Sequence, residues 1–320
     1  MSIISSDISK AVNILKDEEL VAIPTETVYG LAGNIYSEKA INTIFETKKR
    51  PFFNPLIVHI PSINYLNNIA KDIPEKAMHL ATAFWPGPLT LVLKKQPGIP
   101  DLITAGKDTV AVRVPNHPVT LELLQSLDFP LAAPSANPFG SISPTTAKHV
   151  ENYFKEDIKM VLEGGSCKNG IESTIIGFEN EIPVVYRLGS ISIEAIESVV
   201  GKISIKNKKE LKPDAPGMLA RHYAPTTKTI LTTNIPEELN KYIGKRIGIL
   251  VFNNIIKNDS IKYVITLSKN GDLVEAASNL YSALHELDHQ NLDIIIAEKL
   301  PDFGLGKSIN DRLQRATFSH

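Results

Sequence analysis

Pro24-Thr25-Glu26-Thr27-Val28-Tyr29-Gly30-Leu31 carries the strongest structural signal in this chain. It follows residues 20–23, an apolar run typical of a buried strand, and its proline, threonines and glycine are typical of a turn. A second informative stretch, residues 48–59, follows a helix that is expected to begin near Ser37 and to be stopped by Pro51. Both stretches therefore lie on turns beside regular elements, where functional side chains usually sit.

Two later loops carry polar groups of the same kind. Pro134-Ser135-Ala136-Asn137-Pro138 and Gly170-Ile171-Glu172-Ser173-Thr174 place hydroxyls and amides at turns, and Lys48 and Arg50 add two cations. Together these groups are typical of a pocket that handles a nucleotide. The alternative is purely structural, because cations stabilise helix C-termini and Ser, Asn and Pro favour turns for backbone reasons alone.

The first two hundred residues alternate helical and strand patterns, which predicts a mixed α/β sheet. Apolar residues recur at helical spacing from Ile8 to Leu15, directly after Asp7, whose side chain suits a helix N-terminus. Besides residues 20–23, strands are expected at residues 56–60, 89–93, 110–114, 160–162, 173–178 and 184–186.

The last third of the chain has a different organisation. Residues 201–225 are rich in lysine and proline without sustained periodicity and are interpreted as a linker. A strand at residues 247–252, a helix at 273–287 and a strand at 292–297 then predict a small βαβ-type domain.

Composition limits the classes of function. With 320 residues, the chain exceeds the size at which one core usually stops growing, so two domains are expected. The formal net charge of -1 provides no overall field for polyanions, which disfavours stable nucleic-acid binding. One cysteine, Cys167, allows neither an internal disulfide nor a thiolate zinc site, so a cytoplasmic location is expected. Leader and membrane-spanning patterns are lacking, so no membrane association is expected.

The order of these motifs resembles the YrdC-like family of threonylcarbamoyl-AMP synthases over about two thirds of the chain. The resemblance continues through Pro216-Gly217-Met218-Leu219-Ala220-Arg221-His222-Tyr223-Ala224-Pro225, which is similar to the linker of the two-domain long form, although relatives often carry lysine and tyrosine at the Leu219-Ala220 position. It implies a twisted mixed-sheet catalytic domain at residues 1–205, a linker at 206–228 that folds over the active site, and a smaller Rossmann-like α/β domain at 229–320.

The same resemblance implies a nucleotidyltransferase. Members of this family form L-threonylcarbamoyladenylate and pyrophosphate from L-threonine, bicarbonate or CO2, and ATP, for threonylcarbamoyladenosine modification of tRNA. The implied partner is therefore the tRNA-modifying machinery that receives the adenylate, and Mg2+ is expected with ATP because the phosphate charge must be neutralised. The attacking carbamate is already an anion, so alignment and charge neutralisation matter more than a general base.

The resemblance also implies roles for individual residues. Lys48 and Arg50 match the cations that act on the nucleotide phosphates and are the expected catalytic residues. Five positions match those that hold L-threonine: Thr27, His59, Arg113, Ala133 and Ser173. The positions that match ATP contacts are Arg50, Asn54, Thr109, Ser135, Asn137, Ser143, Arg187 and Tyr223.

Structural alternatives remain open for several of these residues. His59 lies in an apolar strand and could be a core histidine, Arg113 could be a strand residue that faces water, and Tyr223 could be an ordinary docking aromatic. The stretch Gly304-Leu305-Gly306-Lys307-Ser308 resembles part of a phosphate-binding loop, but Pro301 stands where that pattern requires glycine. A strand-to-helix turn is therefore expected there.

Two other functions remain as alternatives. One is an RNA-binding or ribosome-associated YrdC-like module without adenylate synthesis, which the near-zero net charge disfavours. The other is carbamoyl transfer in hydrogenase maturation, where a related module stands beside cysteine-rich zinc elements. A chain with one cysteine lacks that context.

Overall fold

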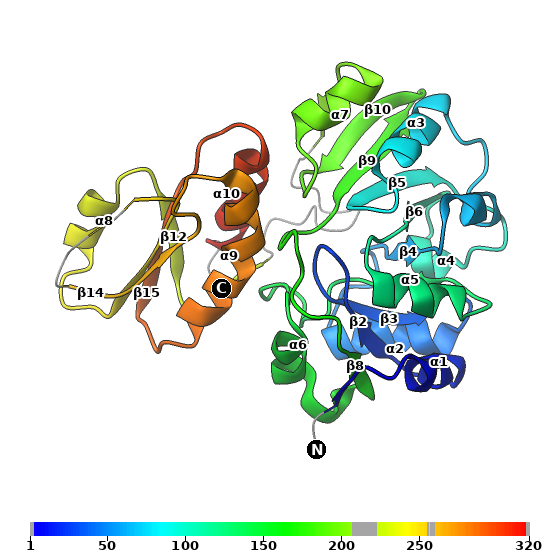
Figure 1. Cartoon of the computed structure of the whole chain (residues 1–320), viewed down its shortest axis with the longest axis horizontal. Helices are drawn as coiled ribbons and strands as arrows, with labels where there is room; N and C mark the ends of the chain where they lie inside the picture. The colour runs from blue at the N-terminus through cyan, green and yellow to red at the C-terminus, as the bar shows by residue number, and fades with distance from the viewer. Residues whose placement is uncertain (1–2, 207–222, 255, 257–259, 318–320) are drawn as a thin grey trace.

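A computed structural model of the chain describes residues 3–206, 223–254, 256 and 260–317. A larger part contains an eleven-stranded mixed sheet, and a smaller part beside it contains a four-stranded parallel sheet (Figure 1). The expected mixed α/β fold with a second, smaller α/β unit is confirmed. Within the described residues, every helix is too short or too polar to cross a membrane.

The eleven-stranded sheet has the strand order β1-β8-β2-β3-β7-β4-β6-β5-β9-β10-β11. Its strands are β1 (Ile4–Ser5), β2 (Val21–Ile23), β3 (Gly30–Asn34), β4 (Ile57–His59), β5 (Leu89–Lys94), β6 (Thr109–Arg113), β7 (Leu131–Ala132), β8 (Met160–Leu162), β9 (Thr174–Glu179), β10 (Ile182–Arg187) and β11 (Ser204–Ile205). The helices around it are α1 (Ile8–Lys16), α2 (Glu38–Lys48), α3 (Glu75–Phe84), α4 (Asp101–Thr104), α5 (Pro118–Gln125), α6 (Ala147–Phe154) and α7 (Ile193–Val200), with 3₁₀ turns η1 (Ile63–Asn68) and η2 (Lys155–Asp157).

Local sequence explains where the first two helices begin. The Asp7 side chain accepts a hydrogen bond from the Lys10 amide at the start of α1, and Ser37 does the same for Ala40 at the start of α2. Helix α2 ends at Lys48, before Pro51, because Lys49 adopts a left-handed conformation with φ 52°. This turn leaves Lys49 exposed while Lys48 and Arg50 are buried.

The smaller sheet has the strand order β12-β15-β13-β14, and all three pairings are parallel. Its strands are β12 (Thr229–Thr232), β13 (Ile247–Val251), β14 (Ile261–Thr266) and β15 (Ile294–Glu298), and its helices are α8 (Ile235–Lys241), α9 (Leu273–Asp288) and α10 (Leu305–Ala316). Alternate residues of β13 face opposite layers: Ile249 packs with α8, and Leu250 packs with the side of α9 and α10.

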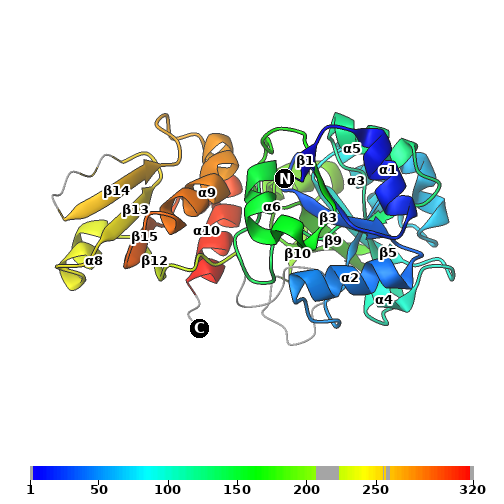
Figure 2. The same ribbon diagram turned by 90° about the horizontal axis from the view of Figure 1, so that it is seen from below.

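Helices α9 and α10 lie between the smaller sheet and the larger part, whereas α8 lies on the far face (Figure 2). Val28 and Ile171 of the larger part join one apolar cluster with Leu280 and Leu284 of α9. Gly170 shows how close the contact is: a Cβ atom there would lie 2.3 Å from the carbonyl oxygen of Ser278. The smaller part therefore packs directly against the loop at residues 170–174.

Two stacked histidines at this contact predict acid sensitivity. The rings of His149 on α6 and His285 on α9 lie 4.0 Å apart, and His285 Nε2 donates to the Ser143 carbonyl at 3.2 Å. Burial, with the neighbouring His149 and His289 as further causes, lowers the pKa of His285 to about 3, while Asp288 opposes the shift. The unfolded chain, with a histidine pKa of about 6.5, binds more protons between these values, so stability is present above pH ~6.5 and is lost as the pH falls.

We expect His285→Gln, which retains a donor for the Ser143 carbonyl, to flatten this pH dependence. One histidine contributes a slope of at most about 1.4 kcal/mol per pH unit. Urea unfolding of wild type and variant at pH 7, 6 and 5 measures the slopes. Equal slopes for the two proteins would show that His285 is not the responsible group.

Candidate active site

A cavity lies at one end of the central strands of the larger sheet. Many residues implicated by sequence line it, namely Thr27, Arg50, His59, Arg113, Ala133, Ser135, Ser173, Arg187 and Tyr223. Other lining residues are Thr25, Val28, Gly30, Pro55, Leu56, Ile57, Pro134 and Glu172. Lys48, Asn54, Thr109, Asn137 and Ser143 are not among the lining residues.

The sheet brings the polar lining residues together. His59 ends β4 and Arg113 ends β6, and these two residues are register partners in parallel neighbouring strands. Ser173 directly precedes β9, while Arg187 ends the antiparallel strand β10. Strand β5 connects the two pairs, because it runs antiparallel to β6 and parallel to β9. Antiparallel neighbours place the start of one strand beside the end of the other, so all four residues lie at the same end of these strands.

Arg113 is held by a buried carboxylate. Its Nη2 lies 2.7 Å from Glu26 Oε1, and its Nε donates to the Gly87 carbonyl at 3.3 Å. The second oxygen of Glu26 accepts from the Asn116 amide at 2.9 Å, so the carboxylate is itself fixed. Glu26 belongs to the first quoted motif, yet sequence reasoning assigned it no role. No local pattern indicates that its partner would be Arg113.

His59 is neutral at physiological pH. Burial, followed by the nearby charge of Arg113, lowers the pKa of its imidazole to about 3. Its Nδ1 lies 3.2 Å from the Ile57 carbonyl, which can only accept, so Nδ1 carries the proton. Nε2 is therefore a hydrogen-bond acceptor, suited to an ammonium, amine or hydroxyl donor of a ligand.

The two cations that follow α2 have different surroundings. Arg50 lines the cavity, and its guanidinium donates to the carbonyls of Asn54 at 3.2 Å and Pro55 at 2.8 Å. Lys48 points elsewhere: its Nζ donates to the carbonyls of Ser135 and Asn137, both at 2.5 Å. In this structure Lys48 therefore holds the loop at residues 135–137 against α2.

Burial disfavours both charges. It lowers the pKa of Lys48 well below its usual value, with Arg50 as a second cause. Burial and then the repulsion of Arg187 lower the pKa of Arg50 to about 9. Arg50 and Arg187 are thus two cations that face one cavity and repel each other, and an anion between them would relieve this repulsion.

Two buried asparagines, Asn54 and Asn137, contact these cations through their backbone carbonyls. Within the described part of the chain, both side-chain amide atoms of Asn54 and the Oδ1 atom of Asn137 have no hydrogen-bond partner. Both side chains are fully buried. An unsatisfied buried polar group costs about 1–3 kcal/mol, so a bound water, an ion or a ligand commonly accounts for such groups.

Thr109 and Ser143, two further predicted residues, lie outside the cavity lining. Thr109 begins β6 and therefore lies at the opposite end of that strand from Arg113. Contact between Thr109 and ATP would require a ligand that extends beyond the cavity. Ser143 Oγ donates to Glu172 Oε1 at 2.6 Å. Of the expected linker, residues 207–222 lie outside the described residues, but Tyr223 is buried against the cavity and the Ala224 amide donates to the Gly140 carbonyl at 2.8 Å.

The stretch at residues 304–308 lies where the connection from β15 enters α10: Gly304 ends the expected strand-to-helix turn, and residues 305–308 already form the first turn of the helix. Gly304 precedes the first residue of α10, and Lys307 Nζ pairs with Glu194 of the larger part at 2.9 Å. Among the described residues, no three His, Cys, Asp or Glu side chains form a group that could hold a metal ion.

Comparison with known proteins agrees with this architecture. The family model described as "Telomere recombination" matches residues 13–189, and one described as "Threonylcarbamoyl-AMP synthase, C-terminal domain" matches residues 191–317. Threonylcarbamoyl-AMP synthase of Pyrococcus abyssi is 41% identical, with 96% of this chain and 93% of that protein aligned. The protein of the same name from Bacillus subtilis is 40% identical over 97% of this chain and 92% of its own length.

A solved structure has the same arrangement over nearly its whole length. The crystal structure of P. abyssi Sua5 complexed with L-threonine has a TM-score of 0.90 and 41% identity, covering 97% of this chain and 94% of that chain. Its coverage extends across both the mixed sheet and the smaller parallel sheet. The chain therefore belongs to the YrdC-like threonylcarbamoyl-AMP synthase family, in its two-domain long form.

Proposed function

We propose that this chain is an L-threonylcarbamoyladenylate synthase. The deprotonated amine of L-threonine adds to CO2 to form a C–N bond and a carbamate, and one proton is released to solvent; starting from bicarbonate, one water molecule leaves instead. One carbamate oxygen then attacks the α-phosphorus of ATP, the new P–O bond forms, and the bond to the leaving pyrophosphate breaks. We further propose that the adenylate passes to tRNA-modifying enzymes in the cytoplasm.

One observation carries this proposal: two buried arginines, Arg50 and Arg187, face the same cavity as the neutral His59 and the clamped Arg113. Within the described residues, Arg50 donates to carbonyl oxygens and forms no ion pair with a carboxylate. A polyphosphate supplies the anion that such a site favours.

We assign the L-threonine end of the site to Thr27, His59, Arg113, Ala133 and Ser173. The guanidinium of Arg113 suits the substrate carboxylate, because arginine can bind a carboxylate through two parallel hydrogen bonds. Glu26 and Gly87 hold the Nη2 and Nε atoms, which fixes the plane of the group. His59 Nε2, as an acceptor, suits the hydroxyl or amino group.

We assign the ATP end to Arg50, Ser135, Arg187 and Tyr223, which line the cavity, and to Asn54, Thr109, Asn137 and Ser143, which lie outside its lining. Of the two expected catalytic cations, Arg50 faces the cavity and Lys48 has a positioning role. Arg50 would act directly on the phosphates. Lys48 would act from its place behind the loop at residues 135–137, by holding Ser135 and Asn137 in position. Mg2+ would arrive with ATP and neutralise phosphate charge during displacement.

A direct test is incubation with ATP, bicarbonate and labelled L-threonine, followed by assays for pyrophosphate and for a threonine-bearing adenylate. The proposal requires both products, and each must depend on all three substrates. Salt-sensitive RNA binding without any turnover would instead support the RNA-binding alternative.

Substrate preference provides a second prediction. We expect L-threonine to be preferred, L-serine to follow at roughly a tenth of its kcat/KM or less, and D-threonine to fail. A methyl group in a fitted pocket is worth only about 1–3 kcal/mol, whereas inverted stereochemistry misplaces the amine relative to the Arg113 clamp. Parallel adenylate assays with each amino acid measure the ratios. Equal use of L-leucine or L-glutamate would contradict the assigned pocket.

A further inference from the structure

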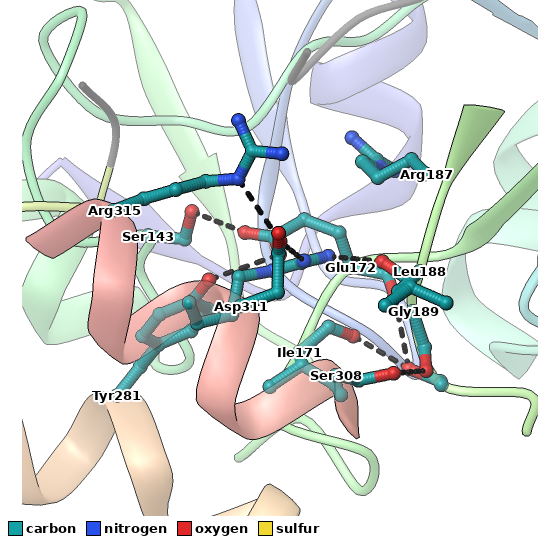
Figure 3. Close-up of polar contacts among 12 residues, drawn as sticks. Ser143, Ile171, Glu172, Arg187, Leu188, Gly189, Tyr281, Ser308, Asp311 and Arg315 are labelled. Atoms are coloured by element: carbon teal, nitrogen blue, oxygen red, sulfur yellow. Dashed lines mark hydrogen bonds and ion pairs between the residues drawn. The ribbon is translucent and has the colours of Figure 1, made fainter. Parts of the chain in front are cut away.

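Arg312 on α10 reaches from the smaller part of the molecule to the back of the cavity. Its side chain is fully buried. Its Nε donates to Glu172 Oε2 at 2.9 Å, its Nη2 to the Leu188 carbonyl at 2.6 Å, and its Nη1 to Asp311 Oδ2 at 2.7 Å. Figure 3 draws this network around Glu172. The guanidinium therefore connects α10 to two segments of the larger part.

Glu172 is the centre of the network and also lines the cavity. Besides Arg312, its carboxylate accepts from Tyr281 Oη of α9 at 2.9 Å and from Ser143 Oγ at 2.6 Å. Burial by itself would raise the pKa of Glu172, but Arg312, Arg187 and the donated hydrogen bonds together hold it below its usual value. Glu172 is thus a fixed carboxylate, and two of its three donors belong to the smaller part.

The segment that Glu172 anchors includes Ser173, assigned above to L-threonine. Ser173 Oγ lies 2.8 Å from Thr90 Oγ1 and accepts from Arg187 Nη2 at 3.0 Å. A shift of Glu172 would therefore displace both Ser173 and the arginine that binds it. Any such shift changes the threonine and phosphate ends of the cavity together.

Arg312 also contacts a second lining residue. Its guanidinium lies over the ring of Tyr223, 4.9 Å from the ring centre, and the rings of Tyr223 and Tyr281 lie 5.7 Å apart. Cation–π contact with a desolvated arginine favours one orientation of the aromatic ring. Arg312 and Tyr281 thus support both Glu172 and Tyr223 from outside the cavity.

Several polar contacts between the two parts do not involve the cavity lining. Lys307 pairs with Glu194, Ser308 Oγ donates to the Gly189 carbonyl at 2.8 Å, and Thr145 bonds to Ser282 at 2.9 Å. A contact needed only for adhesion would not require a buried ion pair, because well-packed apolar residues often stabilise as much. The Arg312–Glu172 pair combines adhesion with a defined geometry at the site.

We propose that Arg312, assisted by Tyr281, is a positioning residue through which the smaller part completes the active site. It sets the positions of the Glu172–Ser173 segment and of Tyr223, and without it L-threonine and ATP are bound in poorer alignment. This inference rests on the proposed function for its kinetic readout. A second readout, described below, does not depend on activity.

The kinetic test compares full-length wild type, Arg312→Gln and the matched control Lys307→Gln, which removes a cation of the same helix that does not reach the cavity. Pyrophosphate release is measured against L-threonine at saturating ATP. We expect kcat/KM for L-threonine to fall on the order of a hundredfold in Arg312→Gln, as misplacement near 1 Å can produce. Lys307→Gln is expected to stay within about twofold, as for a partly exposed ion pair.

The activity-independent readout is amide hydrogen exchange of the backbone at residues 170–174 in the same three proteins. We expect faster exchange there in Arg312→Gln, with little change in Lys307→Gln. If the wild type makes no adenylate, the proposed function fails, and exchange alone decides the positioning role. Wild-type exchange in a folded Arg312→Gln protein would overturn the inference, as would equal kinetic losses in the two variants.

Tyr281→Phe keeps the ring and removes only the hydroxyl that donates to Glu172. If Arg312→Gln does not fold, this variant tests whether α9 and α10 position the Glu172–Ser173 segment. We expect this variant to fold, to bind L-threonine several-fold more weakly, and to show faster exchange at residues 170–174. Unchanged KM and unchanged exchange would overturn the proposal.

Discussion

Arg50→Ala is expected to lower the rate of pyrophosphate release on the order of a hundredfold at saturating ATP. Arg50 faces the cavity, and its repulsion with Arg187 means that an anionic ligand gains from both charges. A cation about 4 Å from a phosphate gains roughly 4 kcal/mol at an effective dielectric near 20, before desolvation is subtracted. Losing one such preorganised group typically costs about 3 kcal/mol of transition-state stabilisation.

The matched control for Arg50→Ala is Lys49→Asn. Lys49 is the adjacent cation but is exposed, and its left-handed conformation with φ 52° is one that asparagine tolerates. We expect this control to keep near-normal turnover. Initial rates of pyrophosphate release, with far-UV circular dichroism to verify folding, measure both effects. Near-normal turnover in folded Arg50→Ala would remove Arg50 from its catalytic role.

Arg113→Gln is expected to have the second large effect, on L-threonine binding and on stability together. Removing the guanidinium abolishes the proposed carboxylate clamp and leaves Glu26 as a buried carboxylate without its ion-pair partner. Breaking a buried pair in this way typically destabilises a protein by about 3–5 kcal/mol. We expect KM for L-threonine to rise on the order of a hundredfold, comparable with loss of about 3 kcal/mol of charged hydrogen bonding.

A double variant separates the two effects of Arg113→Gln. In Glu26→Gln/Arg113→Gln no charge remains buried at this place, so much of the free energy of unfolding should return while L-threonine use stays low. Urea unfolding and L-threonine titrations of the single and double variants make the comparison. Recovery of normal L-threonine use in the double variant would show that Arg113 does not bind the substrate.

Elements with strong local signals could be predicted from the sequence. Asp7 and Ser37 cap α1 and α2 as expected, and the predicted helix at residues 273–287 corresponds to α9 (Leu273–Asp288). Strand β3 (Gly30–Asn34) was not predicted, because two of its five residues are glycines and its strand conformation comes from pairing with β2 and β7. The two-residue strand β7 is too short for any periodicity.

The residues of the candidate site likewise include some that the sequence indicated and others that only the structure identified. Motif order indicated Arg50, His59, Arg113 and Ser173, and the structure places all four around one cavity. Local sequence did not predict the buried partners of these motifs. A charged residue on an amphipathic helix such as α10 is normally expected on its solvated face, yet Arg312 is fully buried.

The sequence by itself determined the mixed α/β class, the two-part organisation and helices α1, α2 and α9, and it indicated several of the side chains that line the cavity. The helices and strands follow from periodicity and capping, which act over a few residues, the two parts follow from chain length and composition, and the site residues follow from the order of the motifs and the resemblance that it carries. Only the tertiary structure decided that Glu26 holds Arg113, that Lys48 faces the loop at residues 135–137, and that α10 supports the cavity. Glu172 and Arg312 are 140 residues apart in the sequence. Each charge strongly favours an oppositely charged partner only once folding has buried both groups away from water, so no local pattern predicts the pair.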